Sequence, residues 1–307
     1  MELQDDYEVR FGKNNFMYLA EIRSATMSAN ECDRKMHDRE VVMVIDFHTH
    51  IFPDKIATKT IQALGQLAGV QASTDGTLNG LLDSMEKCGI DCSVIMPVVT
   101  KPEQFDSINI FAKKVNETYG GRLLSFGGIH PDCEDYKGKL DYIKSLGLGG
   151  IKIHPDYQKV MIDDVRYMRI IEYANELGLM ILTHAGIDIG LPQPVHCPPD
   201  KMRYVLDKLK PNKMVLAHYG GWKQWEMVYE YLAGEQVYFD TAFTFDYIEK
   251  DCFLKILKKH GADKILFATD SPWSDQKAGK EYIQSLPISQ ENKEKILGGN
   301  AKKLLGE

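Results

Sequence analysis

The sequence has no apolar run long enough to cross a membrane. The ~18 to 20 consecutive apolar residues that a transmembrane helix needs do not occur in its 307 residues. It begins Met-Glu-Leu-Gln-Asp-Asp, without the basic and apolar segments of a secretory signal peptide. We therefore expect a protein that neither spans a membrane nor is exported.

The sequence also has no excess of basic residues and no cysteines with paired spacing. Lys and Arg number 37 against 44 Asp and Glu, and the resulting net charge of -7 argues against nucleic-acid binding, which needs a basic patch. The six cysteines are scattered without paired spacing, which is typical of reduced thiols. We expect a cytoplasmic protein whose partner is a small molecule.

The composition that is present is that of an ordinary globular protein, with 44% hydrophobic and 26% charged residues. The length suits one α/β barrel of ~250 residues with little chain left over. Residues 1–40 are polar and charged without a clean period, so we interpret them as an N-terminal extension outside the core, with a short helix within 16–23. The domain itself is expected at residues 41–307.

From residue 41 onward, short apolar runs alternate with segments of helical period. The expected strands are 41–47, 92–97, 123–129, 150–154, 179–183, 213–217, 236–240 and 264–269, each followed by a helical segment. Runs such as Val94-Ile95-Met96 are continuously apolar, as is typical of parallel strands covered on both faces. Eight successive βα units predict a single (β/α)8 TIM barrel of the α/β class. The alternative is an open, doubly wound sheet of ~six strands.

Histidines concentrate at the ends of these runs. Five of the nine lie at a predicted strand end, and an aspartate follows the last strand: His48, His50, His154, His184, His218 and Asp270. Successive side chains of a strand point to opposite faces, so His48 and His50 face the same way. In a barrel the C-terminal ends of all strands meet at one face, and active sites lie there.

Three of these histidines and the aspartate suit a metal ion. His48, His50, His184 and Asp270 offer nitrogen and oxygen ligands with an open position for water. His218 would act beside them as a general acid or base or polarise the substrate, unless its role is structural, and Asp270 would also take a proton from the water. The alternative is a set of polar residues, separately hydrogen-bonded at the barrel rim.

Five segments at the strand ends carry a resemblance to a known family. They are Asp46-Phe47-His48-Thr49-His50, Gly150-Ile151-Lys152-Ile153-His154-Pro155, Thr183-His184-Ala185-Gly186, Ala217-His218-Tyr219-Gly220-Gly221 and Phe267-Ala268-Thr269-Asp270-Ser271-Pro272. Over about residues 43–305 the chain resembles the amidohydrolase superfamily, and within it the branch that includes aminocarboxymuconate-semialdehyde decarboxylase. The resemblance implies that His48, His50, His184 and Asp270 hold one divalent metal ion, commonly zinc. It also implies a catalytic His218 and a metal-activated water as nucleophile.

Lys152 is the main open question in the sequence. It shares a face with His154 at the end of the fourth predicted strand. Some superfamily members carry a carboxylated lysine on this strand that bridges two metal ions. The alternatives are a contact to a substrate carboxylate and a structural ion pair. His154 is either a loop anchor or a substrate contact, and Asp46 either orients the two histidines of its own strand or is structural.

Aromatic side chains follow several predicted strands. Tyr157, Tyr219, Trp222 and Trp273 lie just past strand ends, so we expect them to line a pocket for a small organic substrate. Tyr219 and Trp273, with Lys152 and His154, are the substrate contacts that we predict.

The favoured function is a metal-dependent hydrolase, in which metal-activated water attacks a small carbonyl-containing or carboxylated substrate. A nonoxidative metal-dependent decarboxylase acting on an unsaturated or aromatic carboxylic acid is the first alternative. A non-catalytic ligand-binding barrel is the second. Barrels of this kind often form homodimers, and the composition does not decide this point.

Overall fold

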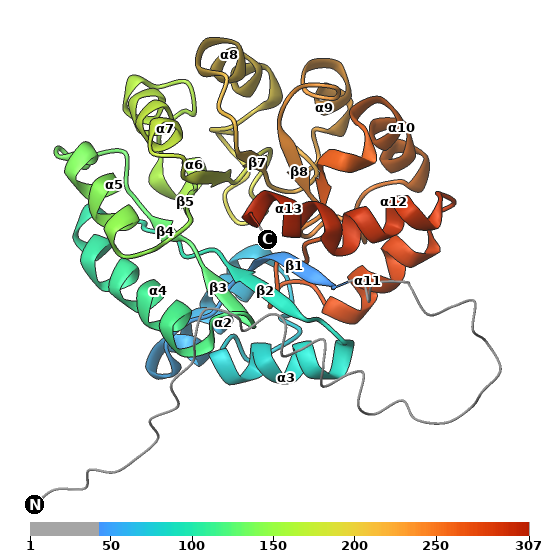
Figure 1. Ribbon diagram of the computed structural model, residues 1–307, viewed down its shortest axis with the longest axis horizontal. Coiled ribbons are helices and arrows are strands. Elements are labelled where there is room, and N and C mark those ends of the chain that lie inside the picture. The colour runs from blue at the N-terminus through green and yellow to red at the C-terminus, as the bar shows by residue number, and fades with distance from the viewer. Residues whose placement is uncertain (1–42, 307) are drawn as a thin grey trace, which may run out of the picture. The chain divides into compact units, whose positions relative to one another are not determined.

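Parallel strands arranged around a common axis dominate the computed structural model, which describes residues 43–306 (Figure 1). The strands are β1 (Ile45–Thr49), β2 (Cys92–Ile95), β3 (Leu123–Ser125), β4 (Gly127–Gly128), β5 (Gly150–Ile153), β6 (Met180–Thr183), β7 (Met214–Leu216), β8 (Tyr238–Asp240) and β9 (Ile265–Leu266). Each pairs in parallel with its neighbour in chain order, within the groups β1 to β3 and β4 to β9. The predicted extension 1–40, with its helix at 16–23, lies outside the described residues.

The two groups of strands form a closed ring. At one junction the chain itself connects them, because β3 and β4 are separated only by Phe126, which divides the third predicted strand and donates its N–H to the carbonyl of Ile95 in β2 at 3.0 Å. At the other junction, the N–H of Phe47 in β1 donates to the carbonyl of Phe267 after β9 at 2.9 Å. The barrel is therefore closed, as the sequence predicted, and the open-sheet alternative is wrong.

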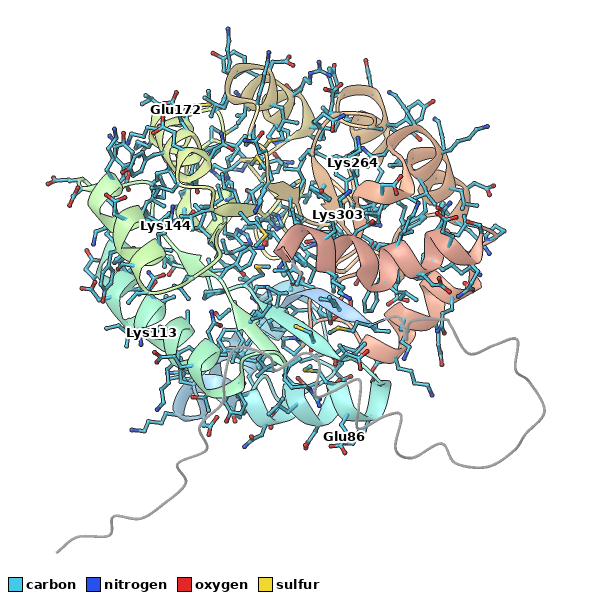
Figure 2. All side chains as sticks on the ribbon, viewed as in Figure 1. Glu86, Lys113, Lys144, Glu172, Lys264 and Lys303 are labelled. Atoms are coloured by element: carbon cyan, nitrogen blue, oxygen red, sulfur yellow. The ribbon has the colours of Figure 1, made fainter. Side chains whose placement is uncertain are left out.

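Helices surround the sheet (Figure 1). They are α2 (Asp54–Ala68), α3 (Leu78–Cys88), α4 (Phe105–Tyr119), α5 (Tyr136–Ser145), α6 (Pro155–Gln158), α7 (Val165–Glu176), α8 (Pro199–Leu209), α9 (Trp225–Tyr231), α10 (Lys250–His260), α11 (Gln276–Ser285), α12 (Gln290–Glu294) and α13 (Asn300–Leu305). In α7 the buried residues Tyr167, Ile170 and Ala174 recur at helical spacing, which turns one apolar face to the barrel. Charged residues such as Glu86, Lys144 and Glu172 project outward from the ring (Figure 2).

Helix α13 closes one end of the barrel. Its buried residues Ala301 and Leu304 belong to the same apolar cluster as Phe47, Val94 and Leu182 of the strands. In Figure 1 the helix crosses the centre of the ring. The strand ends that carry the predicted site residues lie at the opposite mouth, so access to a site must come from there.

No helix within residues 43–306 is long and apolar enough to cross a bilayer. None of the five cysteines in this part of the chain forms a disulfide bond.

Candidate metal centre and cavity

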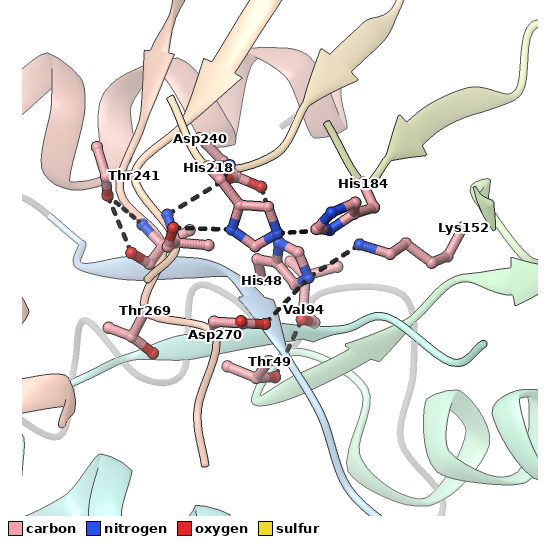
Figure 3. Close-up of polar contacts among 12 residues, drawn as sticks. His48, Thr49, Val94, Lys152, His184, His218, Asp240, Thr241, Thr269 and Asp270 are labelled. Carbon is pink, nitrogen blue, oxygen red and sulfur yellow. Dashed lines mark hydrogen bonds and ion pairs between the residues drawn. The ribbon is translucent and has the colours of Figure 1, made fainter. Parts of the chain in front are cut away.

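The strand ends bring the predicted site residues to one face of the barrel. Figure 3 shows His48 on β1, Lys152 on β5, His184 after β6, His218 after β7 and Asp270 after β9, all directed toward a common centre. Segments far apart in the sequence therefore contribute side chains to a single site.

Three donor atoms form the tightest group. The Nε2 atoms of His48 and His50 lie 3.2 Å apart. Asp270 Oδ1 lies 3.4 Å from the first and 3.0 Å from the second. The backbone supports this arrangement, because the N–H of Asp270 donates to the carbonyl of His48 at 2.8 Å. Two imidazoles and a carboxylate that converge in this way are a suitable ligand set for a divalent transition metal.

Asp240, at the end of β8, determines which nitrogen of His48 faces this group. Its Oδ2 lies 2.9 Å from His48 Nδ1, and a carboxylate only accepts, so Nδ1 carries the proton and the Nε2 lone pair is free. Burial holds the pKa of His48 well below its usual value, which keeps the ring neutral, as metal binding requires. Burial also raises the pKa of Asp240 to about 6, so it is mostly ionised at neutral pH.

Sequence reasoning missed Asp240, although it ends the seventh predicted strand. Its other oxygen accepts from the backbone N–H groups of His218 and Ala242, at 2.9 and 3.0 Å. One carboxylate thus connects β1, β8 and the loop after β7. A signal was present in the sequence, since Asp240 is an acidic residue at the C-terminal end of a predicted strand.

The side chain of Asp46 contacts neither imidazole ring. Its oxygens accept from the backbone N–H of His48 at 3.4 Å, and from Thr269 and Gln276 of α11 at 2.6 to 2.9 Å. The pairing register of β1 shifts between Asp46 and Thr49, so the simple alternation of side chains is interrupted there. The orienting role that we considered for Asp46 falls to Asp240.

His184 and His218 form a second imidazole pair, with Nδ1 and Nε2 2.9 Å apart. His218 Nδ1 lies 3.0 Å from the carbonyl of Ala242, which only accepts, so His218 Nε2 carries a lone pair and His184 Nδ1 donates to it. This leaves His184 Nε2 without a hydrogen-bond partner, and Asp156 Oδ2 also has none, although the two atoms are only 3.6 Å apart. Moving the His184 proton to Nε2 would satisfy both atoms and free Nδ1 to bind a metal ion.

In this arrangement His184 does not join the donor group of His48, His50 and Asp270. Its donor atom belongs to a neighbouring group with His154 and Asp188, whose ligand atoms lie within 4.8 Å of one another. The rings of His154 and His184 are stacked, with centroids 4.2 Å apart. The structure thus brings three of the four predicted ligands together, and stacking and the bond to His218 hold the fourth beside them.

Lys152 is buried at the centre of the site. Its Nζ lies 3.0 Å from His48 Nε2, and burial lowers the pKa of its ammonium group to about 8. No carboxylate within residues 43–306 lies within 4.0 Å of Nζ, so the structural ion pair has no partner in the described part of the chain. From this position Lys152 can contact a metal ion or a substrate.

The remaining predicted contacts divide into two kinds. His154 accepts from the N–H of Tyr157 at 3.4 Å and also lines the cavity, as does Trp273. Tyr219 does not: its ring stacks on Phe253 and its hydroxyl donates to the Phe253 carbonyl at 3.2 Å. Two consecutive residues with positive φ, His218 and Tyr219, turn the chain so that the phenol packs in the core. The prediction of Tyr219 as a substrate contact is wrong.

A cavity of about 610 Å³ opens above these residues, within the range of small-molecule sites. Its floor contains the polar set His48, His50, Lys152, His154, His184, Asp188, His218 and Asp270. The predicted aromatic residues Tyr157, Trp222 and Trp273 line it, and many of its other lining residues are apolar. The arrangement can bind a polar head at the floor and exclude water around it.

Comparisons with known proteins agree with this architecture. No curated protein matches the chain. Among solved structures, 5-carboxyvanillate decarboxylase LigW from Sphingomonas paucimobilis is similar, with 14% identity and a TM-score of 0.62, covering 86% of this chain and 99% of its own. A dihydroxybenzoic acid decarboxylase from Polaromonas sp. JS666, solved with manganese and the inhibitor 2-nitroresorcinol, has 15% identity and a TM-score of 0.63, covering 86% and 96%. A putative amidohydrolase from Staphylococcus aureus has 20% identity and a TM-score of 0.65, covering 86% and 100%.

At these identities the likenesses show a shared fold. Residues 45–306 also match the family model described as Amidohydrolase, which covers nearly the whole barrel. The resemblance drawn from the strand-end segments is thereby confirmed. The chain belongs to the amidohydrolase family and is an enzyme.

Proposed function

We propose that this enzyme is a metal-dependent, nonoxidative decarboxylase of an unsaturated or aromatic carboxylic acid. The observation that carries the proposal is the buried ammonium group of Lys152, 3.0 Å from His48 Nε2, at the floor of a cavity with largely apolar walls. A cation in such surroundings favours an anionic group on the substrate. The decarboxylases with the same fold support this choice over hydrolysis.

His48, His50 and Asp270 would hold a divalent metal ion, with His184 as a fourth ligand once its proton moves to Nε2. When bound, the ion would polarise oxygen atoms of the substrate and offset their negative charge. Nitrogen and oxygen donors suit zinc, our first expectation, and the Polaromonas decarboxylase was solved with manganese. A single ion is proposed, with Lys152 uncarboxylated.

Lys152 would bind the substrate carboxylate. Its N–H now donates to the lone pair of His48 Nε2, which is the atom that a metal ion would occupy. With that acceptor taken, the ammonium group needs another, and a carboxylate of the substrate supplies it.

His218 would supply the proton that decarboxylation consumes. When the C–C bond to the carboxylate breaks, CO2 leaves and the electron pair remains on the substrate carbon, which must then gain a proton. The ring of His218 is oriented by the Ala242 carbonyl, and its Nε2, which carries a lone pair in the neutral ring, faces the site. Nε2 would first take up a proton from water and then deliver that proton to the substrate carbon. The net change replaces a C–COO⁻ bond with a C–H bond.

Hydrolysis is the second candidate, and the position of Asp270 favours it. Its Oδ1 lies beside both histidine Nε2 atoms, where a carboxylate can ligate a metal ion and also accept a proton from an attacking water. The base role that we predicted for Asp270 belongs to this alternative.

Isotope labelling distinguishes the two reactions. The metal-loaded enzyme is incubated in H2¹⁸O with aromatic and unsaturated acids labelled with ¹³C at the carboxyl group, and with the matching esters, amides and lactones. We expect ¹³CO2 release from an acid, without ¹⁸O in the organic product. A product that incorporates ¹⁸O without CO2 release would instead establish hydrolysis.

Two variants connect that activity to the site. His218→Gln is expected to lower the rate by about 10²–10⁴-fold because the proton donor is lost. Lys152→Met should raise KM for the acid, and Lys144→Met, which changes an exposed lysine, should leave both kinetic constants unchanged. Unaltered kinetics in the first two variants would exclude the roles given to these residues.

A further inference from the structure

The cavity extends well beyond the polar floor that the proposed reaction uses. Its volume is about 610 Å³, whereas a cavity of roughly 150 Å³ is enough to hold benzene. A substrate the size of one substituted ring would therefore leave much of the space to water. The part away from the floor, here called the apolar arm, is lined by Ile56, Leu64, Leu67, Ile108, Phe111 and Ile189.

Two helices form the walls of the apolar arm. From α2, the lining residues Ile56, Thr60, Leu64 and Leu67 are three or four positions apart, so they share one face of the helix. From α4, Ile108 and Phe111 have the same relation. Both helices thus turn a side toward the cavity, and Ser107 also lines it on the α4 side.

Most apolar side chains of α2 are not buried in the core of the barrel. Ala57 is the only residue of this helix that is buried, while Ile56 and Leu67 remain 50% and 55% exposed. Large apolar side chains that are half-exposed within a cavity gain free energy when an apolar ligand covers them. Their exposure points to an apolar occupant of the arm.

Charged side chains are few in the cavity and lie at or next to its floor. Among the described residues that line it, Lys152 and Asp270 belong to the floor, and Asp188 lies where the floor meets the arm, with its Oδ1 accepting from the N–H of Gly190 at 2.8 Å beside Leu67. The other lining residues of the arm carry no charge. A second charged group on the substrate, placed in the arm, would lose water without gaining a partner. The head of the ligand can be ionic, and its remainder must be uncharged.

We infer that the substrate is a monocarboxylic acid with an extended, uncharged alkyl or aryl tail that lies between α2 and α4. The position of its carboxyl group rests on the function proposed above, while the tail rests on the arm alone. The substrate class is therefore narrower than that of small aromatic acids in general.

Calorimetric titration of the metal-loaded enzyme with benzoate and a series of 4-alkylbenzoates tests the tail directly, because binding is measured without turnover. We expect Kd to fall by about three- to fourfold for each added methylene group until the arm is filled. A Kd that is independent of chain length, or that rises with it, would overturn the inference.

A matched pair of variants locates the effect. Ile56 and Ile110 are both isoleucines on helices and are 50% and 53% exposed, but only Ile56 lines the cavity. Ile56→Asn should weaken the chain-length dependence while leaving benzoate binding unchanged, and Ile110→Asn should alter neither. Equal effects of the two variants would contradict the proposed location.

A second variant of the arm tests the same point in case Ile56→Asn does not fold. Thr60→Trp fills the arm without introducing charge, and it should abolish the gain from long chains but not the binding of benzoate. Long-chain affinity equal to wild type would exclude the arm as the tail site. Failure of the two proposals is distinguishable, because chain-dependent binding without CO2 release refutes only the reaction, and CO2 release with flat binding refutes only the tail.

Discussion

At the scale of single residues, Asp240 decides whether His48 can act as a ligand. The contact between His48 Nδ1 and Asp240 Oδ2 joins residues 192 positions apart in the sequence and fixes the tautomer of the ring. Without an acceptor at that point, the proton could reside on Nε2 and remove the lone pair that faces His50 and Asp270. The metal site therefore depends on a residue that does not itself touch the donor group.

Replacing Asp240 should weaken metal binding. Asp240→Asn keeps the shape of the side chain but loses the carboxylate that accepts the His48 proton, and we expect roughly 10- to 100-fold lower metal affinity. Competition with a chelator measures this. Asp46→Asn is the control. Asp46 is also a buried carboxylate and lies on β1, the strand of His48, but its side chain bonds to Thr269 and Gln276 and not to a histidine ring.

The control variant should lose stability and keep its metal affinity. Equal losses of metal affinity in both variants would show that general damage to the buried network, and not the His48 tautomer, is responsible. Unchanged affinity in Asp240→Asn would contradict the orienting role.

The convergence of His48, His50 and Asp270 could be predicted from the sequence, since the strand ends of a barrel meet at one face. Their role as metal ligands stays a prediction. Residue-level prediction failed for Tyr219, because the positive φ values of residues 218 and 219 leave no signal in the sequence pattern. Asp240 and Asp156 were missed because their importance lies in contacts to histidines on other strands.

At the scale of elements, the loops after β6 and β7 support one another above the barrel. Gly186 and Trp222 form an isolated parallel bridge, and the N–H of Trp222 donates to the carbonyl of Ala185 at 2.9 Å. Gly186 has a φ of +83°, and a Cβ at this position would collide with the backbone of Trp222. The bridge lies close in sequence to both His184 and His218, so it fixes the imidazole pair.

Gly186→Ala should therefore lower the stability of the protein by more than the positive φ of this residue alone would cause. Gly147 is the matched control, with a φ of +75° and open space where a Cβ would lie. We expect Gly147→Ala to lower the free energy of unfolding by about 1–2 kcal/mol and Gly186→Ala by about 2–5 kcal/mol, measured by urea denaturation. Metal affinity should fall only in Gly186→Ala, and equal effects would exclude the close contact as the cause.

Element boundaries were predictable to different degrees. The succession of strands and helical segments from residue 41 onward was predicted, because helical and strand-like segments differ in the period of their apolar residues. Strands were predicted too long, and the strand 123–129 is divided at Phe126, whose ring packs edge-on against Phe47 inside the barrel. Strand limits depend on backbone bonds to a neighbouring strand, which the pattern of one segment does not contain.

At the scale of the whole molecule, the apolar packing that stabilises the barrel and the polar residues of the site lie at opposite ends. Helix α13 fills the end opposite the site, while the polar residues collect at the mouth where the strands end. Closure of the ring could be predicted, since eight βα units suffice for it. The long cavity could not, because it depends on how α2 and α4 are placed above the strands. The cytoplasmic location and the homodimer stay predictions.

The central claim is that residues from distant strands hold one catalytic metal ion. Anomalous X-ray scattering from crystals of the metal-loaded enzyme, recorded on both sides of the metal's absorption edge, tests it most directly. We expect a single peak bonded to His48 Nε2, His50 Nε2 and Asp270, with His184 Nδ1 as the fourth ligand. A peak found only among His154, His184 and Asp188, or no peak in protein that contains metal by elemental analysis, would contradict it.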